Sequence, residues 1–321
     1  MTSRTAPVIV FAVLAVAAGA GSEALAAPQA AEPNAPDRVP RVSRTVREAA
    51  TPSYRVDEVT GALIPDLRAA AGIIYDVQTG EVIWEENAQD QRSIASITKI
   101  MTAVVFLEQH PDLSEEVLVT RADLRRASTT YLLAGERVTV GDLVHLLLIP
   151  SDNGAARALA RIYPGGSDAF LERMNSKAAE LGLTSTVYAD SSGLSSANLS
   201  SAYDMARLIT YAVSIDRIGS IMRMPRYAFR SSHRREISVR TTNQLVRQGD
   251  VDVVAGKTGF IRKAGYCFAT LLRLPEGGPE VAVVILGAGS SINRFWEARH
   301  LFNWFTQNVN SLFSRTVQYE D

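Results

Sequence analysis

Cysteine and histidine are scarce in this chain, and their scarcity excludes two kinds of chemistry. Cys267 is the only cysteine among 321 residues, so no intramolecular disulfide can form, and we expect it to be a packed strand residue. The four histidines are scattered, and no His/Cys cluster has the spacing of metal ligands: His110, His145, His233 and His300. The sequence therefore predicts a protein that needs no metal and no other cofactor.

An excess of charge of one sign is also missing. The 33 basic and 34 acidic residues give a formal net charge of −1. A protein that binds nucleic acid needs a clearly basic surface, so we expect no nucleic-acid partner. With 46% apolar and 21% charged residues, the chain has the composition of an ordinary globular protein. Its length suits one large domain or two modest ones.

No apolar run is long enough for a membrane span, which takes about 20 residues. The run at 8–20 has 13 residues; Arg4 precedes it, and the small-residue triplet Ala24-Leu25-Ala26 follows it. This pattern is typical of a cleaved signal peptide over 1–26, with a retained anchor as the alternative. We expect a protein secreted to the periplasm or cell envelope, with no stable membrane anchor after cleavage.

Residues 27–55 are rich in proline, alanine and arginine, a composition that cannot bury a core and predicts a linker. Four arginines recur there at every third residue from Arg38 to Arg47. They are either solvated or in contact with an anionic envelope surface. The remaining chain is predicted to hold one catalytic domain over 56–310 and a C-terminal tail over 311–321.

The hydrophobic pattern of the domain predicts an α/β (α+β) fold. Strands are expected at both ends of the domain, with a mostly helical lobe over about 122–225 between them. The two ends are expected to share one antiparallel sheet flanked by helices. The expected strands are 69–75, 81–84, 266–274 and 281–286; the expected helices are 97–107, 141–148, 155–163, 168–181, 201–213 and 292–308.

The first motif that carries chemistry is Ser96-Ile97-Thr98-Lys99, at the start of the expected helix 97–107. Positions i and i+3 share a helical face, so the Ser96 hydroxyl and the Lys99 amine can meet. A serine needs a base to become a nucleophile, and a lysine is a base only when desolvation or a nearby cation keeps it neutral. The apolar neighbours of Lys99 favour that state over a solvated lysine.

Two further motifs follow. Ser151-Asp152-Asn153 offers a second hydroxyl that can relay a proton and an amide that can both donate to and accept from a substrate. Lys257-Thr258-Gly259 offers a lysine and a hydroxyl for a substrate carboxylate, and a glycine beside which a substrate backbone can lie. Taken singly, each triplet is also an ordinary turn sequence.

Lysine itself is rare: the chain has only four lysines among its 33 basic residues. Arginine cannot lose its proton in a protein, whereas a lysine can. Two of the four, Lys99 and Lys257, stand within the two motifs that call for a lysine. This placement argues against coincidence.

The order Ser-x-x-Lys, Ser-x-Asn, Lys-Thr-Gly is the signature of the serine β-lactamases and penicillin-binding proteins. Within that group the chain resembles the low-molecular-mass D-alanyl-D-alanine carboxypeptidases over about 66–308. Stretches such as SIASITKIMTA (93–103), LLLIPSDNGAA (146–156) and GKTGFIRKAGYC (256–267) carry the resemblance. ITKIMTA and the helix after YPGG look most like the D,D-endopeptidase branch. The implied fold is β-lactamase/transpeptidase-like.

The resemblance also implies roles for individual residues. Ser96 would attack a D-alanyl carbonyl to form an acyl-enzyme, with Lys99 as base and Ser151 as proton shuttle. Asn153, Lys257, Thr258 and Gly259 would bind substrate, the N–H groups of Ser96 and Phe260 would form the oxyanion hole, and Arg294 would help to bind a carboxylate or lie on the surface. Asp152 departs from the small residue frequent in the family and would put a negative charge beside the site.

We expect peptidoglycan D-alanyl peptides as substrates and β-lactam antibiotics as inhibitors. The sequence leaves carboxypeptidase and endopeptidase action open. One alternative is a class A β-lactamase, but the required Glu-x-x-x-Asn pattern is missing, since Thr184 stands four residues after Glu180. The other alternative is a catalytically silent wall-binding protein, against which the three intact motifs argue.

Overall fold

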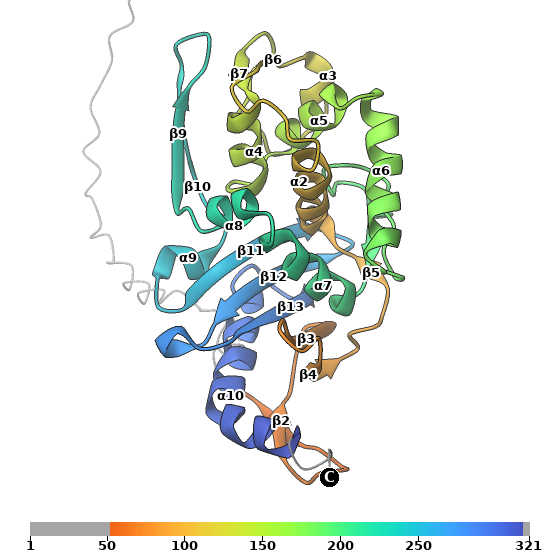
Figure 1. Cartoon of the computed structure of the whole chain (residues 1–321), viewed down its shortest axis with the longest axis vertical. Helices are drawn as coiled ribbons and strands as arrows, with labels where there is room; N and C mark the ends of the chain where they lie inside the picture. The colour runs from red at the N-terminus through yellow and green to blue at the C-terminus, as the bar shows by residue number, and fades with distance from the viewer. Residues whose placement is uncertain (1–51, 317–321) are drawn as a thin grey trace, which may run out of the picture. The chain divides into compact units, whose positions relative to one another are not determined.

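The computed structural model describes residues 52–316, so the predicted signal peptide and most of the predicted linker lie outside the described residues. A central antiparallel sheet, two layers of helices and several two-stranded sheets make up this part of the chain (Figure 1). The elements are β1 Tyr54–Val56, β2 Leu63–Pro65, β3 Ala71–Asp76, β4 Val82–Glu86, β5 Arg92–Ser93, the 3₁₀ helix η1 Ala95–Thr98, α2 Lys99–Leu107, β6 Glu116–Leu118, α3 Arg121–Leu124, β7 Arg137–Thr139, α4 Val140–Leu148, α5 Asn153–Ile162, α6 Gly166–Glu180, β8 Leu199–Ser200, α7 Ala202–Val213, α8 Asp216–Met222, β9 Arg226–Arg230, β10 Glu236–Arg240, α9 Gln244–Gln248, β11 Asp252–Ile261, β12 Gly265–Arg273, the 3₁₀ helix η2 Pro275–Gly277, β13 Glu280–Ala288 and α10 Asn293–Thr316.

The central sheet has the strand order β11-β12-β13-β3-β4, and every neighbouring pair is antiparallel. Three of its four pairings join consecutive strands, β3–β4, β11–β12 and β12–β13, and the pairing of β13 with β3 joins the end of the domain to its beginning. In that pairing Ile73 lies opposite Val284. The expectation of one antiparallel sheet built from both ends of the domain is confirmed.

Alternate residues of the central strands supply two separate cores, as the two-residue period of a strand requires. Ile73 and Val284 face the core that contains α7 and the lobe helices, whereas Ile74 and Val283 face the core that contains α10. Both faces of the sheet are therefore covered, which explains why β3 is buried at every position. Figure 1 shows α7 and α8 on one side of the sheet and α10 on the other.

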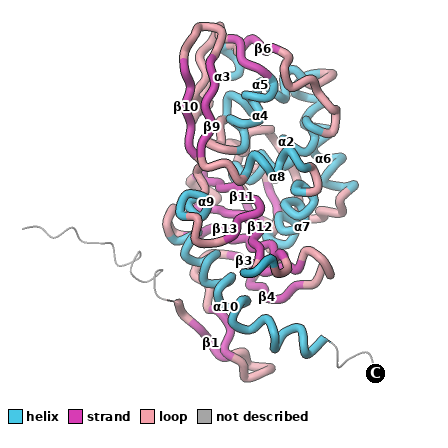
Figure 2. The backbone as a smooth tube through the Cα atoms, turned by 60° about the vertical axis from the view of Figure 1, so that its left-hand side comes forward, coloured by secondary structure: helices cyan, strands magenta, loops and turns pink. Residues whose placement is uncertain are grey.

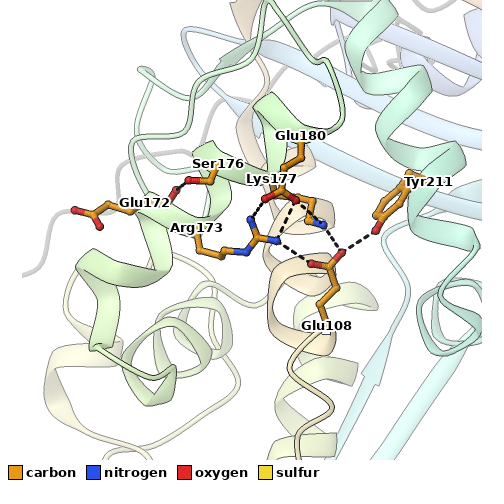
Figure 3. A network of polar contacts seen from close by, with 7 residues as sticks. All are labelled: Glu108, Glu172, Arg173, Ser176, Lys177, Glu180 and Tyr211. Atoms are coloured by element: carbon orange, nitrogen blue, oxygen red, sulfur yellow. Dashed lines mark hydrogen bonds and ion pairs between the residues drawn. The ribbon is translucent and has the colours of Figure 1, made fainter.

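Helix α2 is the centre of the helical lobe and contacts α4, α5 and α6. Every one of its residues is buried, so its apolar sequence needs no polar face. At its end, Glu108 accepts hydrogen bonds from Lys177 Nζ at 2.7 Å and from the Tyr211 hydroxyl at 2.8 Å (Figure 3). Arg173 and Glu180 complete the cluster, which connects α2 with α6 and α7.

Helix α7 packs on the sheet, so the helical region of about 122–225 does not form one body apart from it. The hairpin β9–β10 directly after this region was not predicted. Figure 2 shows it beside the lobe, where the Tyr227 ring stacks on His145 at 4.0 Å. Helix α10 continues to Thr316, past residue 311, where the sequence predicts the tail to begin. No glycine or proline interrupts 308–316.

Candidate active site

The three motifs converge on one cleft of about 270 Å³ between the helical lobe and the edge strand β11. Seven of the nine predicted site residues line it: Ser96, Ser151, Asn153, Thr258, Gly259, Phe260 and Arg294. The other two, Lys99 and Lys257, are buried directly behind the two serines. Residues that are far apart in the sequence thus meet as the motif order predicts.

Ser96 lies in η1, and Lys99 is the first residue of α2. The Lys99 ammonium nitrogen is 3.1 Å from the Ser96 hydroxyl oxygen and 2.6 Å from the Asn153 side-chain oxygen. It also donates to the backbone carbonyl of Ser192. Ala95, just before the serine, has a left-handed backbone with φ of 49°. Such strain at a non-glycine residue is a frequent feature of functional sites.

Lys99 has no exposed surface. Burial, which disfavours the charged amine, lowers the pKa of Lys99 to about 7, although the charges of Asp190 and Asp152 oppose this shift. Near neutral pH a large share of the Lys99 side chain is therefore uncharged. An uncharged amine within hydrogen-bond distance of a serine hydroxyl can accept its proton.

Ser151 lies between α4 and α5, and its backbone is left-handed, with φ of 66°. Lys257 Nζ donates to the Ser151 hydroxyl at 2.7 Å and to the Thr258 carbonyl at 3.0 Å. Burial, together with the nearby charges of Lys99 and Arg294, holds the pKa of Lys257 well below its usual range. The cleft thus contains two serines, each with its own buried lysine.

Asp152 lies beside the site as expected, where its charge acts on Lys99, but its carboxylate does not line the cleft. Its carboxylate is fully buried and caps α5, accepting from the Ala155 N–H at 2.9 Å and the Tyr131 N–H at 2.6 Å. The next residue, Asn153, turns inward and donates to the Ala127 carbonyl at 2.6 Å. Asp152 therefore holds the loop before Tyr131 against the start of α5.

Strand β11 forms the opposite wall of the cleft. A Cβ added at Gly259 would lie 2.8 Å from the Ile94 carbonyl oxygen and 3.0 Å from the Ser96 nitrogen, so only glycine lets β11 come this close to η1. The Thr258 hydroxyl is 2.6 Å from that of Thr242. The Phe260 side chain is 50% exposed and stacks on Tyr266 at 4.2 Å.

Arg294 is not a surface residue, since only 7% of it is exposed. Its guanidinium donates to the Gly259 carbonyl at 3.1 Å and lies over the Phe295 ring. Burial lowers the pKa of Arg294 to about 10, so its charge persists at neutral pH. Cys267 is buried in β12, and burial raises the pKa of its thiol to about 11, which fits the expected packing role.

Sequence reasoning missed the two loops that complete the cleft. Ser128 and Thr129 line it from the loop between α3 and β7, and Leu194 lines it from the loop before β8. Asp190 shapes the second loop by accepting from the N–H groups of Ser192, Gly193 and Ser195. This loop brings the Ser192 carbonyl to Lys99. The available signal was the run SSGLSSANLS at 191–200, in which five serines, one glycine and one asparagine are typical of an ordered loop.

The described residues that line this cleft do not include a group of side chains that usually binds a metal ion. Within residues 52–316 no three His, Cys, Asp or Glu side chains gather in a metal-binding arrangement. No acidic side chain and no histidine is among the described residues that line the cleft. The polar groups available to a reacting molecule are hydroxyls, an amide, a guanidinium and the two amines behind them.

The sheet with helices on both faces and the cleft with its serine–lysine pairs define a serine-type hydrolase. Residues 58–290 match the Peptidase S11 family of D-alanyl-D-alanine carboxypeptidases, and the chain belongs to this family. Over 249 residues it is 32% identical to the D-alanyl-D-alanine endopeptidase of Escherichia coli, covering 76% of this chain and 79% of that protein.

A second related protein and a solved structure agree with this assignment. The D-alanyl-D-alanine endopeptidase of Pseudomonas aeruginosa is 32% identical over 74% of this chain and 77% of its own. The crystal structure of the Streptomyces K15 DD-transpeptidase superposes with a TM-score of 0.70 at 26% identity, covering 75% of this chain and 97% of that one. The predicted family and fold are therefore confirmed.

Proposed function

We propose that this protein hydrolyses D-alanyl peptide bonds of peptidoglycan, at stem-peptide ends or at cross-links, through an acyl-enzyme on Ser96. The observation that carries the proposal is the contact between Ser96 Oγ and the fully buried Lys99 Nζ at 3.1 Å, on the wall of an open cleft. The named relatives include both D-alanyl-D-alanine endopeptidases and carboxypeptidases, and both reactions break the same kind of bond.

Acylation begins when neutral Lys99 takes the Ser96 proton and Oγ attacks the D-alanyl carbonyl carbon. The backbone N–H groups of Ser96 and Phe260 would stabilise the negative oxygen that forms. The C–N bond then breaks, and the leaving amine needs a proton. Ser151 donates it, and the proton that Lys99 took from Ser96 then passes to Ser151 by way of Lys257, with which Ser151 shares a 2.7 Å hydrogen bond. Water next attacks the ester carbonyl, which releases the acid and returns a proton to Ser96.

Substrate binding would use the polar groups around Ser96 and Lys99. The side chain of Asn153 offers an amide to the substrate, and Gly259 leaves room for a substrate backbone beside β11. The Thr258 hydroxyl and the Arg294 guanidinium offer a charge-assisted site for the terminal carboxylate of a D-alanyl-D-alanine end. Thr258 directly follows Lys257 in β11, and Arg294 lies beside Gly259, the next residue of that strand.

The lack of a carboxylate on the described cleft wall argues against a β-lactamase. Rapid hydrolysis of a penicilloyl-enzyme needs a base that activates water, and class A β-lactamases use a glutamate. Here Asp152 is occupied as a helix cap and Asp190 as the centre of a loop. We expect a β-lactam to acylate Ser96 and the resulting acyl-enzyme to be hydrolysed slowly. The paired serines and lysines argue against a silent wall-binding protein.

We further propose that the protein is secreted and acts in the cell envelope. The support is the signal-peptide pattern of residues 1–26, which lie outside the described residues. Within residues 52–316 no helix is both long enough and apolar enough to cross a bilayer. The predicted substrate, a wall peptide, would be met in the same compartment.

The test is a time course of fluorescent penicillin labelling, with Ser96→Ala as the control. A long-lived label that requires Ser96 supports the peptidase. A label that forms and disappears within seconds points to a β-lactamase, and no label at all points to a binding protein. Incubation with monomeric and cross-linked muropeptides then separates carboxypeptidase from endopeptidase activity, because only the first releases free D-alanine from monomers.

A further inference from the structure

A loop over residues 190–195 lies against the start of α2 and contacts it through two consecutive carbonyl groups. The Thr102 hydroxyl donates to the Ser191 carbonyl at 2.6 Å, and the Lys99 ammonium nitrogen donates to the Ser192 carbonyl. Lys99 and Thr102 are three residues apart, so they share one face of the helix. The mechanism proposed above assigns no step to this loop.

The contacts of Lys99 fix the direction of its lone pair once the amine is neutral. A neutral amine has two N–H groups and one lone pair, and carbonyl oxygens can only accept. Two carbonyl oxygens contact Lys99 Nζ, that of Ser192 and that of the Asn153 side chain, whose nitrogen is turned to the Ala127 carbonyl. They occupy both N–H groups, so the lone pair faces the Ser96 hydroxyl at 3.1 Å. A base that already faces its proton needs no reorientation before it reacts.

The Asp190 carboxylate turns the Ser192 carbonyl towards Lys99. One of its oxygens accepts from the N–H groups of Ser192 and Gly193 at 2.9 and 2.6 Å, and the other accepts from that of Ser195 at 2.8 Å. The Ser192 carbonyl and the Gly193 N–H belong to one planar trans peptide group and therefore point in opposite directions. Because Asp190 binds the N–H on one side of this group, the carbonyl is presented to Lys99 on the other side.

Asp190 also contributes charge. Burial is the main cause that lowers the pKa of Lys99, and the negative charge of Asp190 is the largest influence that opposes it. Asp152, at the start of α5, opposes it as well. Arg157 on α5 acts in the other direction, and Lys257 on β11 repels a charged Lys99 in the same way. Without the Asp190 charge, the pKa of Lys99 would fall further.

We propose that Asp190 is a positioning residue for the proposed base, because through the Ser192–Gly193 peptide group it aims the Lys99 lone pair at Ser96. Asp190 is not among the described residues that line the cleft, so it acts through Lys99 and not on the substrate. The inference rests on the proposed function, since it requires Lys99 to be the base of acylation.

The test is the pH profile of the first-order rate of acylation by saturating fluorescent penicillin, which does not depend on the fraction of folded protein. In Asp190→Asn the side chain has no charge and one accepting oxygen instead of two. We expect the plateau rate to fall roughly 10- to 100-fold, because Lys99 loses its fixed direction. The midpoint of the profile should move down by roughly 0.5–1 pH unit, because a negative charge near Lys99 is lost.

Asp204→Asn is the matched control. Asp204 is also a buried carboxylate that shapes a loop, accepting from the Ser185 N–H at 2.8 Å and the Thr186 hydroxyl at 2.7 Å. It is not among the charges that act on Lys99. Asp204→Asn should therefore keep both the plateau rate and the midpoint of the wild-type protein.

Two further variants separate placement from charge and keep the proposal testable should Asp190→Asn fail to fold. Asp190→Glu retains the charge but displaces the carboxylate by one methylene group. Thr102→Val removes the hydrogen bond to the Ser191 carbonyl and leaves every charge in place. Both should lower the plateau rate and leave the midpoint at its wild-type value.

A plateau rate and a midpoint that both stay at wild-type values in Asp190→Asn would overturn the proposal and leave the proposed function intact. A lower plateau with an unmoved midpoint in Asp190→Asn would reduce Asp190 to a structural residue, and equal changes in Asp204→Asn would show a general loss; either result overturns the proposal. A wild-type protein that no penicillin labels would overturn the proposed function first.

Discussion

The Lys257 ammonium nitrogen lies 2.7 Å from the Ser151 hydroxyl oxygen, although Lys257 is on the edge strand and Ser151 is in the lobe. This contact joins the two walls of the cleft. Lys99 and Ser96 form a second pair of this kind, but both belong to the same wall of the cleft. Two hydroxyls are therefore each held by a buried amine, and the proposed function assigns attack to Ser96 and protonation of the leaving group to Ser151.

Removing the second hydroxyl should slow the chemistry without abolishing binding. We expect Ser151→Ala to lower the acylation rate by roughly 10²- to 10⁴-fold, the usual contribution of a positioned proton donor. Stopped-flow measurement with a fluorescent penicillin would check this. Ser176→Ala, whose hydroxyl bonds only the Glu172 carbonyl on α6, should leave the rate unchanged. An unchanged rate in Ser151→Ala would contradict the relay.

The acylation rate should depend on pH through Lys99. Because the base must be neutral and the pKa of Lys99 is about 7, the rate should rise about tenfold per pH unit below 7 and level off above it. Acylation measured from pH 5 to pH 9 gives the profile. Lys99→Arg, whose side chain stays charged, should show no plateau and almost no rate. A rate that falls as pH rises through 7 would rule out Lys99 as the base.

The same burial predicts a pH-dependent cost to folding. The pKa of Lys99 is about 7 in the folded chain, against 10.5 for a lysine in water, so the cost is full below pH 7 and fades as pH rises towards 10.5. Lys99→Met should therefore gain roughly 2–3 kcal/mol more unfolding free energy, relative to wild type, at pH 6 than at pH 9. Urea denaturation at both pH values measures this. Lys263→Met, an exposed lysine, should show no such difference, and equal gains in Lys99→Met would refute the shift.

Gly193 should be intolerant of a side chain. A Cβ there would lie 2.1 Å from the Ala95 carbonyl oxygen and 2.8 Å from the Ser96 nitrogen, and its φ is 80°. We expect Gly193→Ala to destabilise the fold by more than about 3 kcal/mol and to displace Ser96. Gly166→Ala is the matched control, with φ of 76° and nothing within 4 Å, and should cost only about 1–2 kcal/mol. Thermal melts and penicillin labelling compare the two variants, and equal losses would show that backbone strain alone matters.

The parts of the fold with a strong local pattern could be predicted from the sequence. The apolar run after Ser96 predicts the buried helix α2, and the turn residues Asp76 to Gly80 predict the hairpin of β3 and β4. The hairpin β9–β10 was missed although Tyr227, Phe229, Ile237 and Val239 stand at alternate positions of its two strands. The many arginines of this segment suggest a solvated loop. Its apolar side chains become buried only because the hairpin packs against the lobe.

Site residues could be predicted from the sequence where a residue type is rare in the chain. Contacts that depend on how loops pack could not be predicted. A lysine in an arginine-rich chain is informative, so Lys99 and Lys257 could be found from the sequence. The inward carbonyl of Ser192, the cap formed by Asp152 and the contact between Thr242 and Thr258 depend on how loops pack. Asp152 and Asn153 are adjacent in the chain, yet one faces a helix and the other the cleft. No local pattern distinguishes them.

The pairing of β3 with β13 has a consequence for how the protein folds during synthesis. Ile73 finds its partner Val284 only near the end of the chain, so the central sheet cannot close while the ribosome is still synthesising the middle of the domain. Contacts of such long sequence separation slow folding and leave strand edges exposed until they form. Ser96 on η1, the proposed nucleophile, and the edge strand β11 come together only when the sheet closes. A nascent or truncated chain would therefore carry all of Ser96, Lys99 and Ser151 and still react with no penicillin.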